Sequence, residues 1–563
     1  MRMRSRAKAD RLMITSVLAV TSVAAFAVPA RAADATAGVW TTVWGQSQEV
    51  ATSAAMNNFS CRQIVRMSTG GGSSLRVRLS NQFVGSSVTF SAVSVAQRST
   101  DAGITAGTQR SLTFGGAASV TVAAGGDAWS DSLSYATNAN QELAVSYYIA
   151  GSISQYPDHI ALSSPNCTAS GGGNHVADTA SSSFSDHSRR LAYVTGVDTT
   201  GTPGGTIVAL GDSITDGVGA TSNSYNAWVD VLAGRLQDAK STLGVVNEGI
   251  SGNGMSCCSY GPTGVARFNH DVLANSNVKT VILAGGSNDI SGGATAQKVI
   301  DALTQAANSA HDAGLRVVGA TLIPRHGKDD ALTTTGWYAD ASTSDARDAV
   351  RATVNNFIRT TSLYDSFVDF DAAVRDPNAP NYLAAQYNSG DWIHPSDAGH
   401  AAMAKAFNLS TLTSNSAQCT PDTTATYEIA NRNSGKALNV VGSTQTDGAG
   451  IEQWTWGGWT SQKWIFKATG TAGYYYIYNL NSRKFMDISG ASTADGALNT
   501  QYTWNGNNNQ QWAVVDSGGY CKIRNRNSGK VLDIGAASTA DGALNIQWPD
   551  NAGPQQQWTL TAL

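Results

Sequence analysis

The strongest constraint on the fold lies at the C-terminal end of the chain, where one short unit occurs three times. The copies NRNSGKALNV, NLNSRKFMDI and NRNSGKVLDI are separated by 48 and then 46 residues, and begin at Asn431, Asn479 and Asn525. Each copy ends in Gln-x-Trp, which supplies Trp464, Trp512 and Trp558. Repeats of this length cannot bury their apolar faces alone and must stack on one another. Residues 426–563 are therefore predicted to form one threefold-repeated domain, preceded by a Ser/Thr-rich linker at residues 411–425.

The opposite end of the chain has the pattern of an export signal. A basic stretch is followed by a mainly apolar run of 17 residues and by Ala30-Arg31-Ala32, which fits an A-x-A cleavage site. A transmembrane anchor is the alternative, but this apolar run is short for one and lies directly before the cleavage pattern. Residues 1–32 are predicted to be a signal peptide, and the mature protein is predicted to be secreted and extracellular, with no membrane span.

Charge argues against one class of partner. Removal of residues 1–32 takes away six positive charges and one negative charge, which changes the formal net charge from −4 to −9. An acidic chain without a basic patch is a poor ligand for nucleic acid.

Two regions with different hydrophobic periods precede the repeats. Residues 36–200 alternate polar and apolar side chains in short runs such as SLRVRLSNQF, which predicts an antiparallel β-sandwich. From residue 204 to residue 410, five apolar strands alternate with helical stretches, which predicts a five-stranded parallel sheet covered by helices on both faces. In such sheets, ligands bind at the carboxyl ends of the strands.

Six cysteines in an exported chain are candidates for disulfides. Cys61 and Cys167 are the favoured pair because they fall together in the first third of the chain. The adjacent Cys257 and Cys258 either bridge each other or pair elsewhere, and the last two cysteines could link linker and repeat domain (Cys419 and Cys521).

The stretch TIVALGDSITDGVGA contains a candidate nucleophile. Ser213 follows the first strand of the predicted parallel sheet, where a helix is expected to begin. A serine at this place caps a helix as readily as it attacks a substrate. A nucleophilic hydroxyl also needs a base, and the base needs a group that orients it.

Both of these groups occur in DWIHPSDAGH, near the end of the α/β region. Asp391 and His394 are three residues apart, so one turn can bring the carboxylate to the imidazole. Pro395 disfavours helical backbone at His394, so the ring is presented from a loop. Donors for a developing oxyanion could come from the turns after the second and third strands, where Gly252 offers a backbone N–H and Asn288 a side-chain amide.

Other chemistries lack their sequence patterns. The eight histidines form no His-Glu-x-x-His motif and the cysteines form no Cys-x-x-Cys pair, so no metal site is predicted. No phosphate-binding or dinucleotide-binding motif is present, so no cofactor is predicted, and no Gly-x-Ser-x-Gly elbow occurs.

The blocks GDSITDG, NEGISGNG, GGSNDI and DWIHP resemble, in order, the four blocks of the GDSL or SGNH hydrolase family. The resemblance implies a flavodoxin-like α/β/α serine esterase. It implies that Ser213 is the nucleophile, that His394 is the base, and that Asp391 orients the base. The oxyanion hole would be formed by the Ser213 amide, Gly252 and Asn288.

The C-terminal repeats resemble the ricin-B-type β-trefoil, a carbohydrate-binding module. In that family each repeat binds sugar with an early Asp, an aromatic ring and a late polar residue. By motif, the second repeat would use Asp487, Tyr502 and Asn509, and the third Asp533, Trp548 and Gln555. The first repeat departs from the pattern, because Asn439 replaces the Asp and Ser461 replaces the late amide, although Trp454 is retained.

The remaining regions give weaker indications. The N-terminal region resembles the accessory β-domain of some xylan-associated SGNH esterases and either shapes the cleft or supports it. The long segment after the fourth strand, with Trp337 and Tyr338, is expected to cover the site.

Together these features predict a secreted serine esterase that deacylates polysaccharide, of an acetylxylan-like kind, held by the trefoil. One alternative is an extracellular lipase, phospholipase or arylesterase of broad specificity. Another is a lectin with an inert hydrolase domain.

Overall fold

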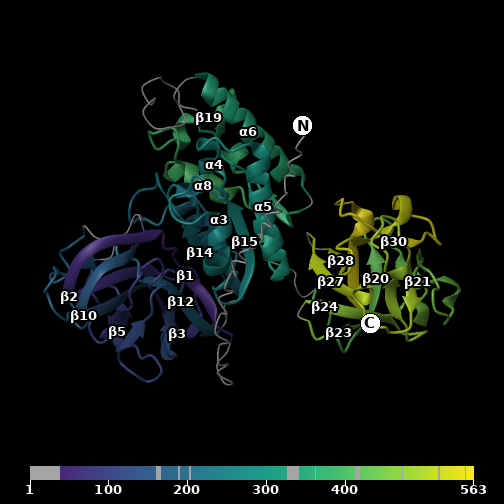
Figure 1. Ribbon diagram of the computed structural model, residues 1–563, viewed down its shortest axis with the longest axis horizontal. Coiled ribbons are helices and arrows are strands. Elements are labelled where there is room, and N and C mark those ends of the chain that lie inside the picture. Colours follow the sequence, from purple (N-terminus) through teal and green to yellow (C-terminus); the bar gives the residue numbers. More distant parts are fainter. Residues whose placement is uncertain are drawn as a thin grey trace, which may run out of the picture. The chain divides into compact units, whose positions relative to one another are not determined.

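The computed structural model describes residues 39–159, 166–187, 190–201, 204–325, 341–361, 363–412, 419–471, 473–517, 520–551 and 553–563. The predicted signal peptide lies outside these residues, as do Trp337 and Tyr338. The protein is multidomain, with an N-terminal antiparallel β-sandwich, a central α/β/α domain and a C-terminal β-trefoil, as expected from the sequence (Figure 1). No helix in the described part of the chain is long and apolar enough to cross a membrane.

The N-terminal sandwich consists of two main sheets of antiparallel strands. One sheet has the order β1-β12-β3-β8, with β9 also paired to β3; the bounds are Thr41–Gly45, Val194–Gly201, Gly72–Ser80, Asp127–Trp129 and Leu133–Thr137. The other has the order β11-β2-β10-β5-β6, with bounds Asn166–Cys167, Val50–Arg66, Glu142–Asp158, Ala92–Gln97 and Arg110–Ser111. A further pair is β4 with β7 (Val88–Phe90 and Val120–Val122).

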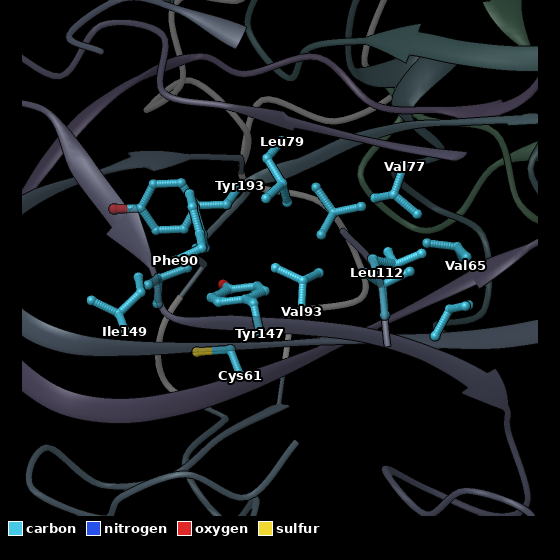
Figure 2. Packing of buried hydrophobic residues seen from close by; sticks show 14 of the residues in the cluster. Cys61, Val65, Val77, Leu79, Phe90, Val93, Leu112, Tyr147, Ile149 and Tyr193 are labelled. Carbon is cyan, nitrogen blue, oxygen red and sulfur yellow. The ribbon is translucent and has the colours of Figure 1, made fainter. Parts of the chain in front are cut away.

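Aromatic rings fill the core between these sheets. Phe90, Tyr147 and Tyr193 meet edge to face, with ring centroids 5.1 to 5.8 Å apart (Figure 2). This is the arrangement that aromatic quadrupoles favour. The predicted Cys61–Cys167 disulfide is confirmed and fully buried beside this cluster.

The central domain is built on a parallel sheet with the strand order β14-β13-β15-β16-β17, which confirms the predicted five strands. Their bounds are Leu243–Gly249, Gly205–Gly211, Val278–Ala284, Arg316–Ala320 and Ser366–Val368. Every residue of β13 is buried, and its alternate side chains enter two separate cores. Because the strand order reverses at β13, its carboxyl end opens into the crevice where ligands bind in such sheets.

Helices cover both faces of this sheet, since one core contains residues of α2 and α8 and the other contains residues of α3, α5 and α6. These helices span Trp228–Asp238, Asp397–Lys405, Gly264–Phe268, Ala296–Asp312 and Ala341–Thr360. Shorter elements are α1, α4, α7, the π-helix η1 and the hairpin β18–β19 (Ser213–Asp216, Ser287–Ser291, Phe370–Val374, Asn269–Leu273, Arg375–Asp376 and Ala379–Leu383).

The sandwich and the sheet pack closely at β1 and β14. A Cβ atom on Gly45 would lie 2.5 Å from Val246 Cγ1, so the glycine permits this approach. Nearby, Thr206 Oγ1 donates to the Thr42 carbonyl at 2.8 Å, and the Ser276 amide donates to Thr42 Oγ1 at 2.7 Å. The interface is therefore ordered by hydrogen bonds between the two domains.

The C-terminal trefoil repeats a four-stranded unit, and β20 pairs with β31 to close the ring. The three tryptophans of the Gln-x-Trp motifs are fully buried in its core. Trp464 and Trp512 occupy equivalent environments, because each indole donates to a strand carbonyl, that of Leu438 at 3.0 Å and of Met486 at 3.1 Å. The strands β20 to β31 span Thr426–Asn431, Ala437–Val440, Ile451–Trp454, Trp464–Ala468, Tyr474–Asn479, Phe485–Ile488, Asn499–Tyr502, Gln511–Asp516, Cys521–Asn525, Val531–Ile534, Asn545–Trp548 and Trp558–Ala562.

A second disulfide joins Cys419 to Cys521. The link predicted as possible, between the linker at residues 411–425 and the repeat domain, is therefore confirmed.

Removal of the Cys61–Cys167 disulfide should destabilise the sandwich. The bond closes a loop with a sequence separation of 106 residues, and loss of such a link typically lowers the free energy of unfolding by about 2–5 kcal/mol. The Cys61→Ser/Cys167→Ser variant should show a lower calorimetric transition temperature. Cys257→Ser, at a free cysteine, is the control. Equal transitions in all three proteins would contradict the prediction.

Candidate active site

The structure brings the three predicted catalytic side chains into one hydrogen-bonded chain. Ser213 Oγ lies 2.9 Å from His394 Nε2, and His394 Nδ1 lies 2.5 Å from Asp391 Oδ2. Ser213 is the first residue of α1, directly beyond the carboxyl end of β13. This is the geometry that a serine nucleophile, its base and an orienting carboxylate require.

Local backbone geometry explains how the serine is presented. The Asp212 carboxylate caps α1 by accepting from the Ile214 amide at 3.0 Å, and Gly217 ends the helix in a left-handed conformation. The cap is therefore supplied by Asp212. The Ser213 hydroxyl is left to contact His394.

The turn before His394 is held by the same carboxylate that orients the ring. Asp391 Oδ1 accepts from the backbone amides of Ile393 and His394, each at 2.8 Å. Burial opposes ionisation of Asp391, but the hydrogen bonds and charge of His394 outweigh it and hold the pKa of this carboxyl well below its usual range. Asp391 is therefore ionised, and it favours the tautomer with the proton on Nδ1, which leaves Nε2 to accept the serine proton.

The predicted oxyanion donors lie after the two strands that flank β13. Gly252 belongs to the turn after β14 and has a positive φ of 77°, and Asn288 lies in α4 after β15. The two turns are joined, because Asn288 Nδ2 donates to the Asn253 carbonyl at 2.9 Å. The structure thus brings these residues to the same edge of the sheet as Ser213.

Two side chains that hold these turns were missed in the sequence. The buried Asp289 carboxylate accepts from the amides of Met255, Ser256 and Cys257 at 2.6 to 3.0 Å. Its position directly after Asn288 in the GGSND block was an available signal.

The second missed side chain is Arg267, which is also buried. It donates to the Gly211 carbonyl at 2.8 Å, to the Glu248 carbonyl at 2.7 Å and to Asn253 Oδ1 at 3.1 Å. It thereby ties the end of β13 to the turn that carries Gly252. No motif marks this arginine in the sequence.

Beyond the Gly252 turn, the remaining cysteines are free thiols. Cys257 Sγ and Cys258 Sγ lie 2.7 Å apart, and Cys258 is exposed. Neither of the pairings considered from the sequence is formed in the described structure.

The sequence gave no metal motif, but one group of described residues could offer ligand atoms to a metal ion. It consists of Glu49, His159 and Asp216, whose candidate atoms lie within 4.8 Å of one another. Glu49 and His159 come from the sandwich, and Asp216 ends α1.

In the trefoil, the structure places the predicted sugar-binding groups on the same faces of two hairpins. Asp487 pairs with Thr500 across β25 and β26, so Tyr502, two residues further on, shares its face. Asp533 pairs with Ile546 in the same way, which puts Trp548 on its face. Tyr502 is 45% exposed and Trp548 is 40% exposed, so both rings are available to stack on a sugar.

The late polar residues differ between these two repeats. Asn509 Nδ2 donates to Asp487 Oδ2 at 2.9 Å, as the predicted site requires. Near Asp533, however, the closer amide is that of Gln556 at 2.8 Å, whereas the predicted Gln555 lies at 3.5 Å. Burial raises the pKa of both carboxyls, to about 6 for Asp487, against hydrogen bonds from Gln510 and Asn509 to Asp487 and from Gln556 and Gln555 to Asp533.

The first repeat has a different polar pair. Asn439 Nδ2 donates to Glu452 Oε1 at 2.9 Å, and Glu452 stands where the other repeats have Thr500 and Ile546. A carboxylate is therefore retained on the neighbouring strand.

Comparison with known proteins identifies two families. Residues 209–402 match the model of the GDSL-like Lipase/Acylhydrolase family. Residues 413–502, 460–548 and 508–563 match the model described as Ricin-type beta-trefoil lectin domain-like. Both resemblances seen in the sequence are thereby confirmed. No curated protein matches the chain.

Similar solved structures include the designed threefold symmetric protein ThreeFoil, 43% identical with a TM-score of 0.24, where the match covers 24% of this chain and 99% of that one. The exo-beta-1,3-galactanase 1,3Gal43A from Clostridium thermocellum is 41% identical with a TM-score of 0.25, and the match covers 25% of this chain and 31% of that one. The Rhizoctonia solani agglutinin is 20% identical with a TM-score of 0.23, and the match covers 25% and 95%.

Replacement of Asp391 by Asn should leave the fold intact but impair the base. The Asn amide can donate to Nδ1 and so favours the wrong imidazole tautomer. In serine proteases the equivalent replacement lowers kcat about 10⁴-fold. Asp391→Asn should lower kcat for p-nitrophenyl acetate by at least about 10²-fold. The control is Asp312→Asn, at the exposed end of α5. Unchanged turnover in Asp391→Asn would show that the carboxylate does not orient His394.

The carboxylates of the second and third repeats should dominate sugar binding. Loss of a hydrogen bond to a charged group costs about 1.5–3 kcal/mol, so Asp487→Ala and Asp533→Ala should each weaken binding about tenfold or more. Asn439→Ala, at the equivalent position of the first repeat, is the matched control. Affinity electrophoresis against soluble xylan, mannan and galactan measures this. An equal loss in all three variants would contradict the assignment.

Proposed function

We propose that this chain, whose central domain belongs to the GDSL-like lipase/acylhydrolase family and whose C-terminal domain is a ricin-type β-trefoil lectin domain, is a secreted serine esterase. Its substrate is an acylated polysaccharide of the acetylxylan kind, which the trefoil holds. The observation that carries the proposal is the hydrogen-bonded chain Ser213–His394–Asp391 at the carboxyl end of β13.

The reaction follows from this geometry. Ser213 Oγ attacks the ester carbonyl carbon while His394 Nε2 takes the hydroxyl proton, and Asp391 stabilises the imidazolium that forms. The negative charge that develops on the carbonyl oxygen is stabilised by the Ser213 amide, the Gly252 amide and Asn288 Nδ2. Collapse of the tetrahedral intermediate expels the alcohol, which takes its proton from His394 and leaves an acyl-enzyme.

Water completes the cycle. His394 removes a proton from a water molecule as it attacks the acyl-enzyme, and the same ring returns this proton to Ser213 when the acid leaves. In each step His394 exchanges the proton at Nε2, while the hydrogen bond to Asp391 keeps a proton on Nδ1. The net reaction converts one ester and one water molecule into one alcohol and one carboxylic acid.

Carbohydrate as the substrate class is supported by the C-terminal domain of the chain. A lectin domain on the same polypeptide raises the local concentration of polymer-borne esters at the esterase. The buried carboxylates and exposed rings of the second and third repeats are suited to sugar hydroxyls and sugar faces.

Replacement of the nucleophile tests the esterase. Ser213→Ala should abolish hydrolysis of p-nitrophenyl acetate, because no other group in the chain of hydrogen bonds can form the acyl-enzyme. Binding to polysaccharide should persist in this variant. A fluorophosphonate should label wild-type Ser213, as read by peptide mass spectrometry. An unlabelled Ser213 would instead favour a lectin with an inert hydrolase domain.

The acyl and polymer preferences need a separate measurement. Rates on p-nitrophenyl esters of increasing chain length should fall steeply after acetate, and acetate should be released from acetylated xylan faster than from acetylated mannan or pectin. A preference for long acyl chains would favour the alternative that the protein is a lipase or phospholipase. Ser213→Ala is the blank for every substrate.

A further inference from the structure

One histidine of the sandwich is buried against the helix that carries the nucleophile. His159 is 5% exposed and lies just after β10, between two carboxylates. Its Nδ1 lies 3.2 Å from Glu49 Oε1, and its Nε2 lies 3.3 Å from Asp216 Oδ1. Glu49 belongs to the sandwich, whereas Asp216 is the last residue of α1, so the histidine joins the two domains.

Asp216 continues this chain toward the oxyanion turn. Its second oxygen, Oδ2, accepts a hydrogen bond from Ser251 Oγ at 2.6 Å. Ser251 directly precedes Gly252, whose amide is a proposed oxyanion donor. Asp216 is also three residues from Ser213 in the same short helix. Asp216 therefore connects the helix that carries Ser213 to the turn that carries Gly252.

Two carboxylates face the two ring nitrogens of His159 and favour its protonated form. Burial alone would lower its pKa, but the charges and hydrogen bonds of Asp216 and Glu49 outweigh burial and raise the pKa of His159 to about 10. The two ring nitrogens face different carboxylates. A metal ion would instead take one ring nitrogen and draw both carboxylates to that side. The geometry thus favours an imidazolium that bridges Glu49 and Asp216.

A second contact from the same sandwich segment supports this connection. Ser47 Oγ lies 2.6 Å from Glu248 Oε2 and accepts from Arg267 Nη1 at 2.9 Å. Arg267 is the guanidinium that holds the Gly211 carbonyl and Asn253. Segment 47–49 of the sandwich therefore contacts the supports of both sides of the site, the end of β13 and the Gly252 turn.

We propose that His159 is a positioning residue supplied by the accessory sandwich: it holds Asp216 and, through Ser251, fixes the Gly252 turn relative to Ser213. This inference rests on the proposed esterase function. It gives the sandwich a role in catalysis, because a misplacement of about 1 Å at reacting groups can cost about 10²-fold in rate.

The test is a double-mutant cycle with p-nitrophenyl acetate on the full chain. His159→Gln and Ser251→Ala should each lower kcat about 10- to 100-fold, with KM changed much less. Because both act through Asp216, the double variant should be no slower than the slower single variant, whereas independent effects would multiply. His175→Ala, at a half-exposed histidine of the same sandwich, is the matched control and should keep wild-type kcat.

Stability and metal dependence are measured alongside. Ser251 belongs to the central domain and not to the sandwich, so Ser251→Ala keeps the test valid even if His159→Gln folds poorly by calorimetry. Wild-type kcat in Ser251→Ala or in folded His159→Gln, or multiplicative losses, would overturn the proposal. Loss of wild-type activity on chelation, restored by a divalent cation, would also overturn it in favour of a metal site.

The outcomes separate this proposal from the proposed function. If wild-type protein hydrolyses the ester and is labelled at Ser213 while the variants keep full activity, the positioning role fails and the esterase stands. If wild-type protein neither turns over nor is labelled, the esterase itself fails.

Discussion

The close packing of β13 between β14 and β15 is the constraint on which the proposed active site depends. Glycines at the strand ends permit this packing. A Cβ atom on Gly211 would lie 2.7 Å from the Ala284 carbonyl oxygen, and one on Gly249 would lie 2.2 Å from the Asp216 amide nitrogen. Larger residues would push α1 away from the sheet. With glycine at both places, Ser213 is held beside the turns that follow the neighbouring strands.

Buried or partly buried carboxylates then fix each of these turns. Asp212 caps the helix that begins with Ser213, Asp289 accepts from three amides of the turn after β14, and Asp391 holds both the backbone and the ring of His394. Turns held in this way keep their amide dipoles fixed. A catalytic site gains most when such dipoles need not reorganise during the reaction. The negative charges of this site therefore serve geometry as much as proton transfer.

The sandwich and the trefoil contribute in different ways. The sandwich meets the catalytic domain through polar contacts, in which Thr42, Ser47 and His159 reach groups next to the sheet and its turns. The trefoil is organised around its own core, which contains the three buried tryptophans of the repeats. Its repeats preserve that core closely, while the buried carboxylates and amides of the predicted sugar sites vary from one repeat to the next.

The sequence by itself determined what depends on local order. The alternation of strands and helices predicts the parallel sheet, and the spacing of Asp391 and His394 predicts their contact, because each pattern is set by residues close together in the chain. The repeat predicts the trefoil because similar units must stack to bury their apolar faces. Arg267 and Gly211 are 56 residues apart, and their contact could not be read in this way. His159 lies in another domain from Asp216, and Gln556 replaces Gln555 as the nearer partner of Asp533. Such contacts depend on how packed elements and whole domains meet, and no local period encodes that arrangement.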